Sequence, residues 1–335
     1  MVLVTGGTGL VGSHLLLQLV LSNTRVKAIY RTKAKLQEVQ KIFSYYSETP
    51  QFLFDKIDWV KADILDIPSL EIAFKNVDFV YHAAALISFD PNDFDKLERT
   101  NVKGTANVVN LCIAHKVKKL CYLSTIGTIG RSLIEKKADE TNEWSEHNTN
   151  VYALTKYAAE IEVWRGSQEN LPVVILNPGV ILGPGFWNKG SGKLFRTVAK
   201  GRSYYPPGGT GFVTVSDVVQ LMLQLMESNI HGERFIVVGQ NLTFHKIMSA
   251  IAKEFGGKPP YKMLEIWQLQ LGRYGDWFLN LITGSKRSIT KNAIYSLQHP
   301  EIYDASKIKS VLNFEFEPLQ NTIKLSCEKF TLESS

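Results

Sequence analysis

The chain has 335 residues, of which 44% are hydrophobic and 21% are charged, and its formal net charge is +6 at pH 7. This composition is close to that of ordinary globular proteins, so it excludes wholesale disorder and allows two domains or one large α/β unit. The Lys and Arg residues are scattered along the chain, so the positive charge predicts a solvated surface and no nucleic-acid partner.

The cysteines and the apolar stretches indicate where the protein resides. Cys112, Cys121 and Cys327 form no CxxC pair and have no spacing with His that is typical of a metal site. Free thiols in apolar segments behave as small hydrophobic groups, which favours a reducing cytoplasm and no metal. Gly6 and Gly7 interrupt the first apolar run, so no signal peptide is predicted. The longest apolar stretches are too short to cross a bilayer, and we expect no membrane partner.

In the first half of the chain, short apolar runs alternate with amphipathic segments. Strands are predicted at residues 2–4, 26–30, 57–60, 79–82, 120–123 and 173–176, and helices at 10–21, 68–75, 94–115 and 152–170. The strand candidates are nearly all apolar, which is typical of strands that are buried on both faces. Alternation of this kind predicts an α/β Rossmann fold, with a doubly wound parallel sheet and right-handed crossovers.

The pattern changes after about residue 178. Residues 177–192 and 201–211 are rich in Gly and Pro, which predicts loops. A helix is predicted over 215–227, with Ser216 or Asp217 as its N-cap, and a strand near 235–238 is expected to return to the first sheet. We therefore expect an NADP-binding domain over residues 1–177, followed over 178–335 by a smaller, mostly substrate-binding region of mixed helices and loops.

A glycine-rich turn lies between the first predicted strand and the first predicted helix. It reads Val4-Thr5-Gly6-Gly7-Thr8-Gly9-Leu10-Val11-Gly12. Gly6 permits a tight turn, Gly9 lets the backbone approach a pyrophosphate, and Gly12 lets the helix pack closely. The N–H groups and the positive dipole end at the helix N-terminus attract phosphate. In this context the turn predicts a dinucleotide site rather than a plain connection.

The end of the second strand indicates which nicotinamide cofactor is bound. NAD enzymes place an Asp or Glu there for the ribose hydroxyls. Here the strand ends in Arg31, followed by Lys33 and Lys35, and no carboxylate is near. A guanidinium suits a 2′-phosphate, and a lysine would add a second charge. A solvated basic loop is the alternative. The sequence favours NADP(H), with NAD as the second choice.

Two other strand ends carry candidate cofactor contacts. Asp63 and Ile64 follow the third strand, where Asp63 would meet the adenine amino group or, equally well, serve as a helix cap or turn residue. His82, Ala83 and Ala84 end and follow the fourth strand, where small side chains let the backbone run beside a dinucleotide. Packing alone would explain these alanines nearly as well.

Tyr152 and Lys156 are four residues apart, on one face of a predicted helix. Tyrosine has a pKa of about 10 and is a poor proton exchanger at neutral pH. We expect the Lys156 ammonium to favour the phenolate and to lower the pKa of Tyr152. The fifth strand ends in Ser124 and Thr125, at the sheet edge where open α/β folds bind ligands. Either hydroxyl is a candidate partner for the substrate oxygen, or a satisfied turn hydroxyl.

Together these motifs resemble the extended short-chain dehydrogenase/reductase superfamily, the NAD-dependent epimerase/dehydratase superfamily, over essentially the whole chain. The resemblance rests on Thr5–Gly12, Asp63-Ile64, His82-Ala83-Ala84, Asn101-Val102-Lys103-Gly104-Thr105, Ser124-Thr125, Tyr152-x-x-x-Lys156 and Asn177-Pro178-Gly179. Within the superfamily the chain looks most like the dihydroflavonol 4-reductase branch, on the residues Val26–Arg31 and Ile126-Gly127-Thr128.

The resemblance implies a role for each matched residue. Tyr152 would be the acid/base, Lys156 its activator and ribose anchor, and Thr125 the hydroxyl that holds the substrate oxygen. Asn101 would support the active-site helix. Residues that would line the nicotinamide pocket are Pro178 and Val180.

The expected activity is NADP(H)-dependent reduction of a carbonyl, or oxidation of a secondary alcohol, in a small organic substrate. The first alternative is a nucleotide-sugar epimerase or dehydratase that recycles tightly held NAD. The second is a non-catalytic dinucleotide sensor of the same fold. Members of the family commonly form homodimers by pairing two long helices. We expect such a homodimer here, through the helices predicted at 94–115 and 152–170.

Overall fold

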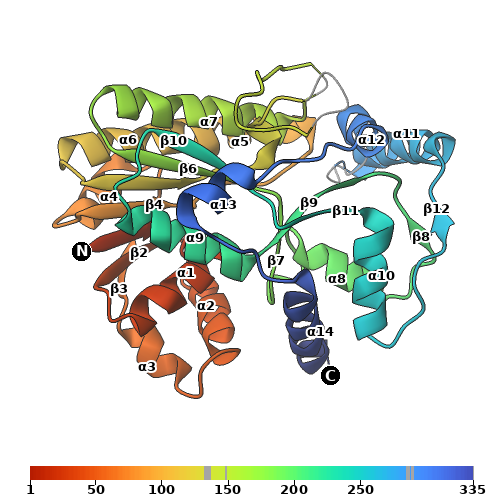
Figure 1. The fold of residues 1–335 in the computed structure, drawn as a ribbon, viewed down its shortest axis with the longest axis horizontal. Coiled ribbons are helices and arrows are strands. Elements are labelled where there is room, and N and C mark those ends of the chain that lie inside the picture. The colour runs from red at the N-terminus through yellow and green to blue at the C-terminus, as the bar shows by residue number, and fades with distance from the viewer. Residues whose placement is uncertain (132–136, 148, 284–286, 288–289, 335) are drawn as a thin grey trace.

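The computed structural model describes residues 1–131, 137–147, 149–283, 287 and 290–334. Within these residues seven parallel strands form one sheet, in the order β10-β6-β5-β4-β1-β2-β3 (Figure 1). The strands are β1 (Val2–Thr5), β2 (Val26–Tyr30), β3 (Asp58–Lys61), β4 (Phe79–His82), β5 (Lys119–Leu123), β6 (Val173–Pro178) and β10 (Glu233–Val237). The order reverses between β1 and β4, which is the switch point where open α/β sheets bind ligands. The predicted Rossmann fold is confirmed.

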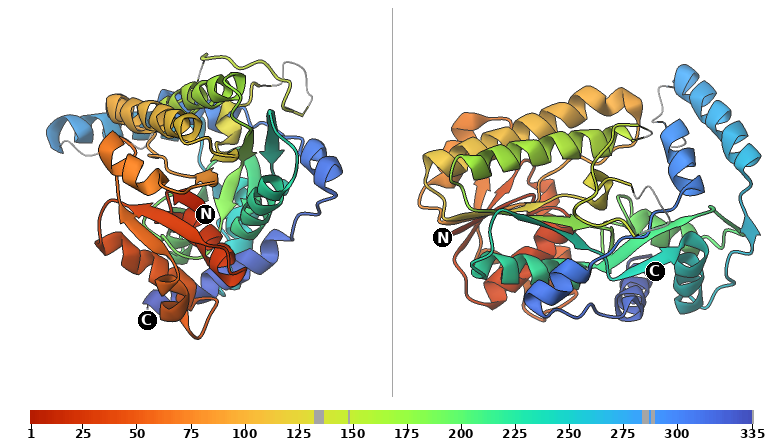
Figure 2. Two further views of the ribbon diagram at one scale, coloured as in Figure 1. Left: turned by 90° about the vertical axis from the view of Figure 1, so that its left-hand side faces the viewer. Right: turned by 45° about the horizontal axis from the view of Figure 1, so that its top comes forward.

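Helices cover both faces of this sheet because successive side chains on each strand point to opposite sides. Val4 and Ala28 belong to the core under one layer, whereas Leu3 and Ile29 belong to the core under the other. The first layer contains α1 (Leu10–Leu21), α2 (Ala34–Ser44), α3 (Pro50–Asp55), α9 (Val215–Glu227) and α13 (Ser306–Leu312), and the second contains α4 (Ile67–Phe74), α6 (Gly104–Ala114) and α7 (Val151–Gln168). Figure 2 shows the two layers on either side of the strands.

The rest of the chain forms a separate body beyond the carboxyl ends of the strands (Figure 2). Its strands are β7 (Val180–Leu182), β8 (Tyr204–Tyr205), β9 (Gly209–Thr214), β11 (Gln240–Thr243) and β12 (Lys262–Met263), paired as β11-β9-β7 and β12-β8. Its helices are α8 (Gly192–Ala199), α10 (Phe244–Glu254), α11 (Ile266–Thr283), α12 (Lys291–Gln298) and α14 (Leu319–Ser334). A third apolar core, with Phe195, Phe212, Ile251 and Ile323 at its centre, joins β7, β8, β9, β11, α8, α10 and α14.

Four expectations about local structure were wrong. The segments predicted as loops at 177–192 and 201–211 contain β7, β8 and the start of β9. The helix predicted at 94–115 is divided into α5 (Phe94–Leu97), a π-helical segment (Glu98–Lys103) and α6. The strand β3 is not buried on both faces, since it is the outermost strand and its Asp58 and Lys61 are exposed. The N-cap of α9 is Thr214, whose Oγ1 accepts a hydrogen bond of 2.9 Å from the Asp217 N–H, and neither Ser216 nor Asp217 takes this position.

Segments from the second half of the chain return to the first sheet. The strand β10 pairs with β6, and α9 and α13 contribute to the core beneath it. The division at residues 177 and 178 stays a prediction. No helix among the residues described is long and apolar enough to span a membrane.

Candidate active site

A cavity of about 1870 Å³ lies at the carboxyl edge of the parallel sheet, between the sheet and the C-terminal body. Its wall includes the glycine turn, the ends of several strands, the first turns of α7 and the segment before α8. Pockets for a single small molecule usually measure about 300–1,000 Å³. The cavity therefore has room for a large ligand and a second, smaller one beside it.

The glycine turn is shaped by close backbone packing. Gly6 has φ +73°, and a Cβ there would lie 2.5 Å from the backbone of Ala83. A Cβ on Gly12 would lie 2.2 Å from the carbonyl oxygen of Gly6. The helix α1 begins at Leu10 with no side-chain cap and no acidic residue in its first turn. Its first N–H groups therefore face the cavity without a competing anion, which fits the pyrophosphate of a dinucleotide.

Most of the predicted cofactor residues line this cavity. They are Gly6, Thr8, Gly9, Leu10, Val11, Gly12, Arg31, Lys35, Ile64, Ala83, Ala84, Tyr152, Lys156, Pro178 and Val180. Asp63 and His82 do not. The buried His82 ring lies under the glycine turn, 2.6 Å from Thr5 Oγ1 and 2.9 Å from Thr105 Oγ1. Burial lowers the pKa of His82 to about 3, with a smaller contribution from the Lys156 charge, so the ring is neutral and joins β1, β4 and α6.

The expectation that no carboxylate is near Arg31 was wrong. Asp63 Oδ2 lies 3.8 Å from Arg31 Nη1, because β2 and β3 are neighbouring parallel strands and their ends lie side by side. Asp63 Oδ1 accepts a hydrogen bond of 3.0 Å from the Leu65 N–H. Of the two roles that the sequence left open, the structure places Asp63 in a turn and beside Arg31.

Three cations gather where the cavity meets the end of β2. Arg31, Lys35 and Lys189 all line the cavity. Burial lowers the pKa of Lys35, and the charges of Arg31 and Lys189 lower it further. Glu38, 3.8 Å from Lys189 Nζ, only partly offsets this repulsion. An anion at this point of the cavity would relieve the repulsion among the three cations.

Thr125, Tyr152 and Lys156 line the same cavity. The helix α7 begins at Val151 and is capped by Asn150, whose Oδ1 accepts a hydrogen bond of 2.9 Å from the Ala153 N–H. This cap holds the first turn of the helix, including Tyr152, at the edge of the sheet. The adjacent Phe89 ring lies edge-on to that of Tyr152, with their centroids 5.8 Å apart.

The expected lowering of the Tyr152 pKa was wrong for this state of the protein. Burial raises the pKa of Tyr152, so the phenol keeps its proton at neutral pH. The Lys156 ammonium is directed toward β5, where it donates to Tyr122 Oη at 2.5 Å and to the Leu123 carbonyl at 2.8 Å. Burial lowers the pKa of Lys156 to about 7, and the Glu160 carboxylate opposes this shift.

The sequence-based interpretation missed Tyr122. This side chain is fully buried, accepts the Lys156 hydrogen bond and stacks on the His82 ring at 5.4 Å. Tyr122 lies two residues before Ser124 and on the same face of the strand, and this position could have indicated that its side chain belongs to the site. The pairing with His82 follows from the register of β4 and β5, which the sequence does not show.

Asn101, in the π-helical segment, connects two parts of the cavity wall. Its Oδ1 accepts a hydrogen bond of 2.8 Å from the Leu86 N–H, and its Nδ2 donates to the Leu86 carbonyl and to Thr155 Oγ1, both at 3.1 Å. Leu86 lines the cavity, and Thr155 lies between Tyr152 and Lys156 on α7. The buried Asn101 thus fixes the catalytic helix against the segment that follows β4.

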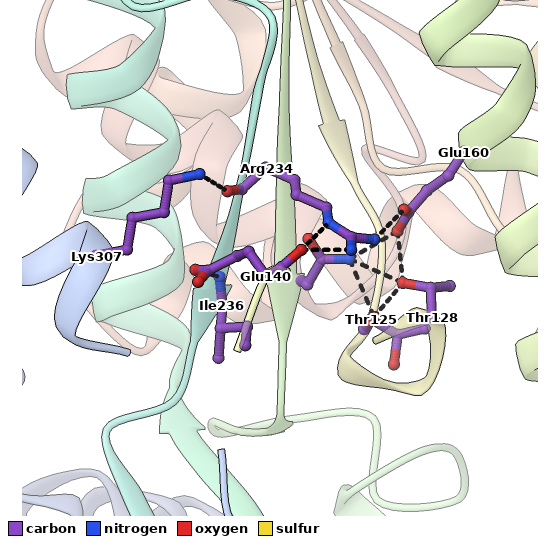
Figure 3. Close-up of polar contacts among 8 residues, drawn as sticks. Thr125, Thr128, Glu140, Glu160, Arg234, Ile236 and Lys307 are labelled. Carbon is purple, nitrogen blue, oxygen red and sulfur yellow. Dashed lines mark hydrogen bonds and ion pairs between the residues drawn. The ribbon is translucent and has the colours of Figure 1, made fainter. Parts of the chain in front are cut away.

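A buried polar network holds the turn of Thr125 (Figure 3). Thr125 Oγ1 accepts a hydrogen bond of 3.2 Å from the Gly127 N–H, and the Thr125 carbonyl accepts from Thr128 Oγ1 at 2.8 Å and Asn177 Nδ2 at 3.2 Å. Asn177 Nδ2 also donates to Glu160 Oε1 at 2.6 Å, and Thr128 Oγ1 lies 2.6 Å from the same oxygen, so its single proton is shared between Glu160 and the Thr125 carbonyl. The sequence-based interpretation missed Glu160. Its position one helical turn after Lys156 could have indicated that its carboxylate lies near the site.

The network extends to the edge strand β10. Glu160 Oε2 lies 3.8 Å from Arg234 Nη1, and Arg234 Nε donates to the Glu140 carbonyl at 3.1 Å. Glu140 Oε1 accepts a hydrogen bond of 2.7 Å from the Ile236 N–H, and Lys307 Nζ donates to the Arg234 carbonyl at 3.0 Å (Figure 3). Residues far apart in the sequence therefore share one buried charge system behind the site.

Among the residues described, no three His, Cys, Asp or Glu side chains gather in a group able to hold a metal ion. Cys112, Cys121 and Cys327 are buried free thiols, and burial raises the pKa of each.

Comparison with known proteins agrees with this geometry. The model of the NAD dependent epimerase/dehydratase family matches residues 2–239. The chain belongs to this family. It is therefore an enzyme of the extended short-chain dehydrogenase/reductase type, in a family that binds NAD-type cofactors and acts on small molecules.

Relatives in the family include both reductases and dehydratases. The chain is 28% identical to sterol demethylase protein B of Methylococcus capsulatus, over 77% of this chain and 75% of the relative. It is 27% identical to tetraketide alpha-pyrone reductase 2 of Arabidopsis thaliana, over 77% of this chain and 83% of the relative. The solved structure of gox2253 has a TM-score of 0.81 at 24% identity, and the match covers 99% of this chain and 98% of that one. This likeness shows the fold alone.

Proposed function

We propose that this protein is an NADP(H)-dependent oxidoreductase that reduces a carbonyl, or oxidises a secondary alcohol, of a small organic substrate, in the manner of the dihydroflavonol 4-reductase branch. One observation carries the proposal: Thr125, Tyr152 and Lys156 face a cavity that also contains the glycine turn. The cavity is larger than a single small-molecule pocket, so a substrate fits beside a dinucleotide.

The cation cluster supports NADP(H) over NAD(H). Arg31, Lys35 and Lys189 lie where the end of β2 would meet the adenosine ribose. A 2′-phosphate would accept charge-assisted hydrogen bonds from them and relieve the repulsion that lowers the pKa of Lys35. Asp63 does not line the cavity, which argues against a contact with the ribose hydroxyls.

When bound, NADPH supplies the hydride. Tyr152 holds its proton at neutral pH, but burial also makes the phenol a weaker acid by raising its pKa. Donation of this proton to the substrate oxygen therefore depends on a positive charge that stabilises the phenolate. Thr125 Oγ1 already accepts a hydrogen bond from Gly127, and its own proton would be donated to the substrate oxygen. After proton transfer, the Lys156 ammonium would stabilise the phenolate and hold the ribose.

The test is a panel of carbonyl and alcohol substrates, followed by the absorbance of NADPH and of NADH. We expect turnover that prefers NADPH and that falls by about 10²-fold or more in Tyr152→Phe. Arg31→Ala should raise KM for NADPH by about tenfold or more and leave KM for NADH nearly unchanged, because only the former carries the 2′-phosphate. Purified protein that retains stoichiometric NAD and turns over a nucleotide sugar without added cofactor would contradict the proposal.

We also propose that the protein is cytoplasmic and forms a homodimer through α6 and α7. Three buried free thiols fit a reducing compartment. Ile161 on α7 is exposed, which is the kind of apolar contact that such a pairing would cover. Sedimentation that shows only monomer at micromolar concentration would refute the dimer.

A further inference from the structure

The helix α11 has an inverted distribution of side chains. Trp267, Leu271 and Tyr274 follow one another at helical spacing and are 61%, 62% and 60% exposed. Ile282, four turns after Trp267 on the same face, is 64% exposed. A surface helix normally turns its apolar stripe toward the core, whereas this one presents it to the outside.

Several polar side chains of α11 are turned toward the protein together with the buried Leu269, whereas Gln270 is exposed. Asp276 lies 3.8 Å from Arg287, and both side chains are about four-fifths buried. Arg273 is half-buried, and with Arg287 and Phe89 it lines a small pocket beside the main cavity. The outward apolar face is therefore not a consequence of loose packing, because the inward face makes specific polar contacts.

Neighbouring residues extend the apolar face. Tyr204, Tyr261 and Met263, on and beside the β8–β12 pair, are exposed next to the start of α11. We call this surface the aromatic face; it consists of Tyr204, Tyr261, Met263, Ile266, Trp267, Leu271, Tyr274, Trp277 and Ile282. In Figures 1 and 2, α11 lies at the end of the molecule farthest from the N-terminal helices, with α12 as its neighbour.

Basic residues lie beside the aromatic face where the chain approaches α11. Residues 257–291 contain six Lys or Arg and two acidic residues, a net charge of +4 in the sequence, but Arg273 and Arg287 belong to the inward side of α11. Lys262 Nζ lies over the Tyr204 and Tyr261 rings, at 5.7 and 5.5 Å, and Lys258 is exposed nearby. The exposed acidic residue of the stretch, Glu265, lies at the start of α11.

We propose that the aromatic face binds the surface of an anionic lipid membrane, with α11 lying in the plane of the headgroups. Trp and Tyr prefer the boundary between headgroups and acyl chains, and basic residues beside an apolar helix face are attracted to anionic lipids. A second copy of the chain is a poorer occupant, because pairing two such faces would bring like charges together. This proposal departs from the expectation of no membrane partner, which rested on apolar stretches too short to cross a bilayer, because α11 would lie on the membrane surface.

Because of where α11 lies, membrane binding would bring the wall of the main cavity close to the lipid. The helix α12, which packs beside α11, contributes Tyr295, Ser296 and Leu297 to the wall of the main cavity. Membrane binding at α11 therefore places that wall next to the lipid.

The test is co-flotation of the full-length protein with vesicles of phosphatidylcholine alone and of phosphatidylcholine with phosphatidylglycerol. We expect binding to the anionic vesicles with a blue shift of tryptophan emission, and binding that is weaker by about tenfold or more on phosphatidylcholine alone or in high salt. The double variant Trp267→Ser/Leu271→Ser should lose about tenfold or more of the affinity. Its matched control is Phe52→Ser/Ile72→Ser, which removes two equally exposed apolar side chains from α3 and α4.

Each outcome decides the proposal without reference to catalysis. All four substitutions are at exposed positions, so unchanged thermal melting will show that the variants are folded. The proposal is overturned if the wild-type protein floats with neither vesicle, or if the α11 variant binds as well as the control. It is also overturned if the α11 substitutions dissociate a dimer while vesicle binding is absent, because the occupant is then a second copy.

Discussion

Replacing Asn101 by Ala tests whether the contact between the π-helical segment and α7 positions the catalytic helix. The change removes three hydrogen bonds, two to the Leu86 backbone and one to Thr155 Oγ1. A typical hydrogen bond contributes about 1 kcal/mol net, and unsatisfied buried groups cost more. Leu86 is only half-buried, so water partly replaces its lost partners. We therefore expect a loss of about 2–4 kcal/mol in the free energy of unfolding.

The same substitution should slow turnover more than it weakens cofactor binding. Asn101 contacts neither the glycine turn nor the cation cluster, whereas Thr155 lies within the Tyr152–Lys156 turn. A displacement of about 1 Å at reacting groups lowers rates by about 10²-fold. Denaturant unfolding and steady-state kinetics measure both effects. The control is Asn110→Ala on α6, which removes an exposed hydrogen bond of 2.7 Å to Arg165 and should change stability by less than about 0.5 kcal/mol. Equal effects of the two variants, or an unchanged kcat in Asn101→Ala, would refute the reasoning.

Three further predictions follow from buried charge and close packing. Burial lowers the pKa of Lys156 to about 7, so its positive charge is lost as the pH rises through 7. We expect kcat/KM for NADPH to fall above that pH. In Lys156→Arg this fall in kcat/KM above pH 7 should be absent. Burial raises the pKa of Asp217 to about 6, so the native state binds this proton more tightly than the unfolded state, and the stability contributed by the protonated form is lost as the pH rises from 4 to 6. Asp217→Asn should therefore stabilise the protein by about 2 kcal/mol in denaturant unfolding at pH 7.5 and give no gain at pH 4; a gain that is independent of pH would contradict this. In Gly12→Ala the new Cβ would lie 2.2 Å from the Gly6 carbonyl, so dinucleotide binding by titration should be lost, whereas Gly275→Ala, with open space around it, should bind normally.

The sequence predicts the Rossmann sheet well because its signals are local. A strand buried on both faces is mostly apolar, and the strands that contain Leu3, Ile29 and Val174 are of this kind, although each also buries one polar residue. The glycine motif is also local, since Gly12 packs against Gly6, although the contact of Gly6 with Ala83 after β4 is not. Where a strand lies at the edge of the sheet, as β3 does, the same rule fails because one side of the strand is open to water.

Features of the site that depend on which strands are neighbours were not predicted. Asp63 reaches Arg31 only because β3 lies beside β2, and Tyr122 stacks on His82 only through the register of β4 and β5. Helical spacing brings Lys156 to the face of Tyr152, but it does not fix where a long side chain points. That direction is set by acceptors on β5, which no spacing along the helix can reveal.

The charge network behind Thr125 has a consequence for synthesis on the ribosome. Thr125 and Glu160 leave the ribosome well before Arg234, and Lys307 follows much later still. Until that arginine emerges, Glu160 lacks its cationic partner, and burial, which raises the pKa of Glu160, favours its protonated form. The β6 edge of the nascent sheet also lacks its β10 neighbour while another 56 residues are added beyond β6, a delay in which this edge is exposed to incorrect pairing.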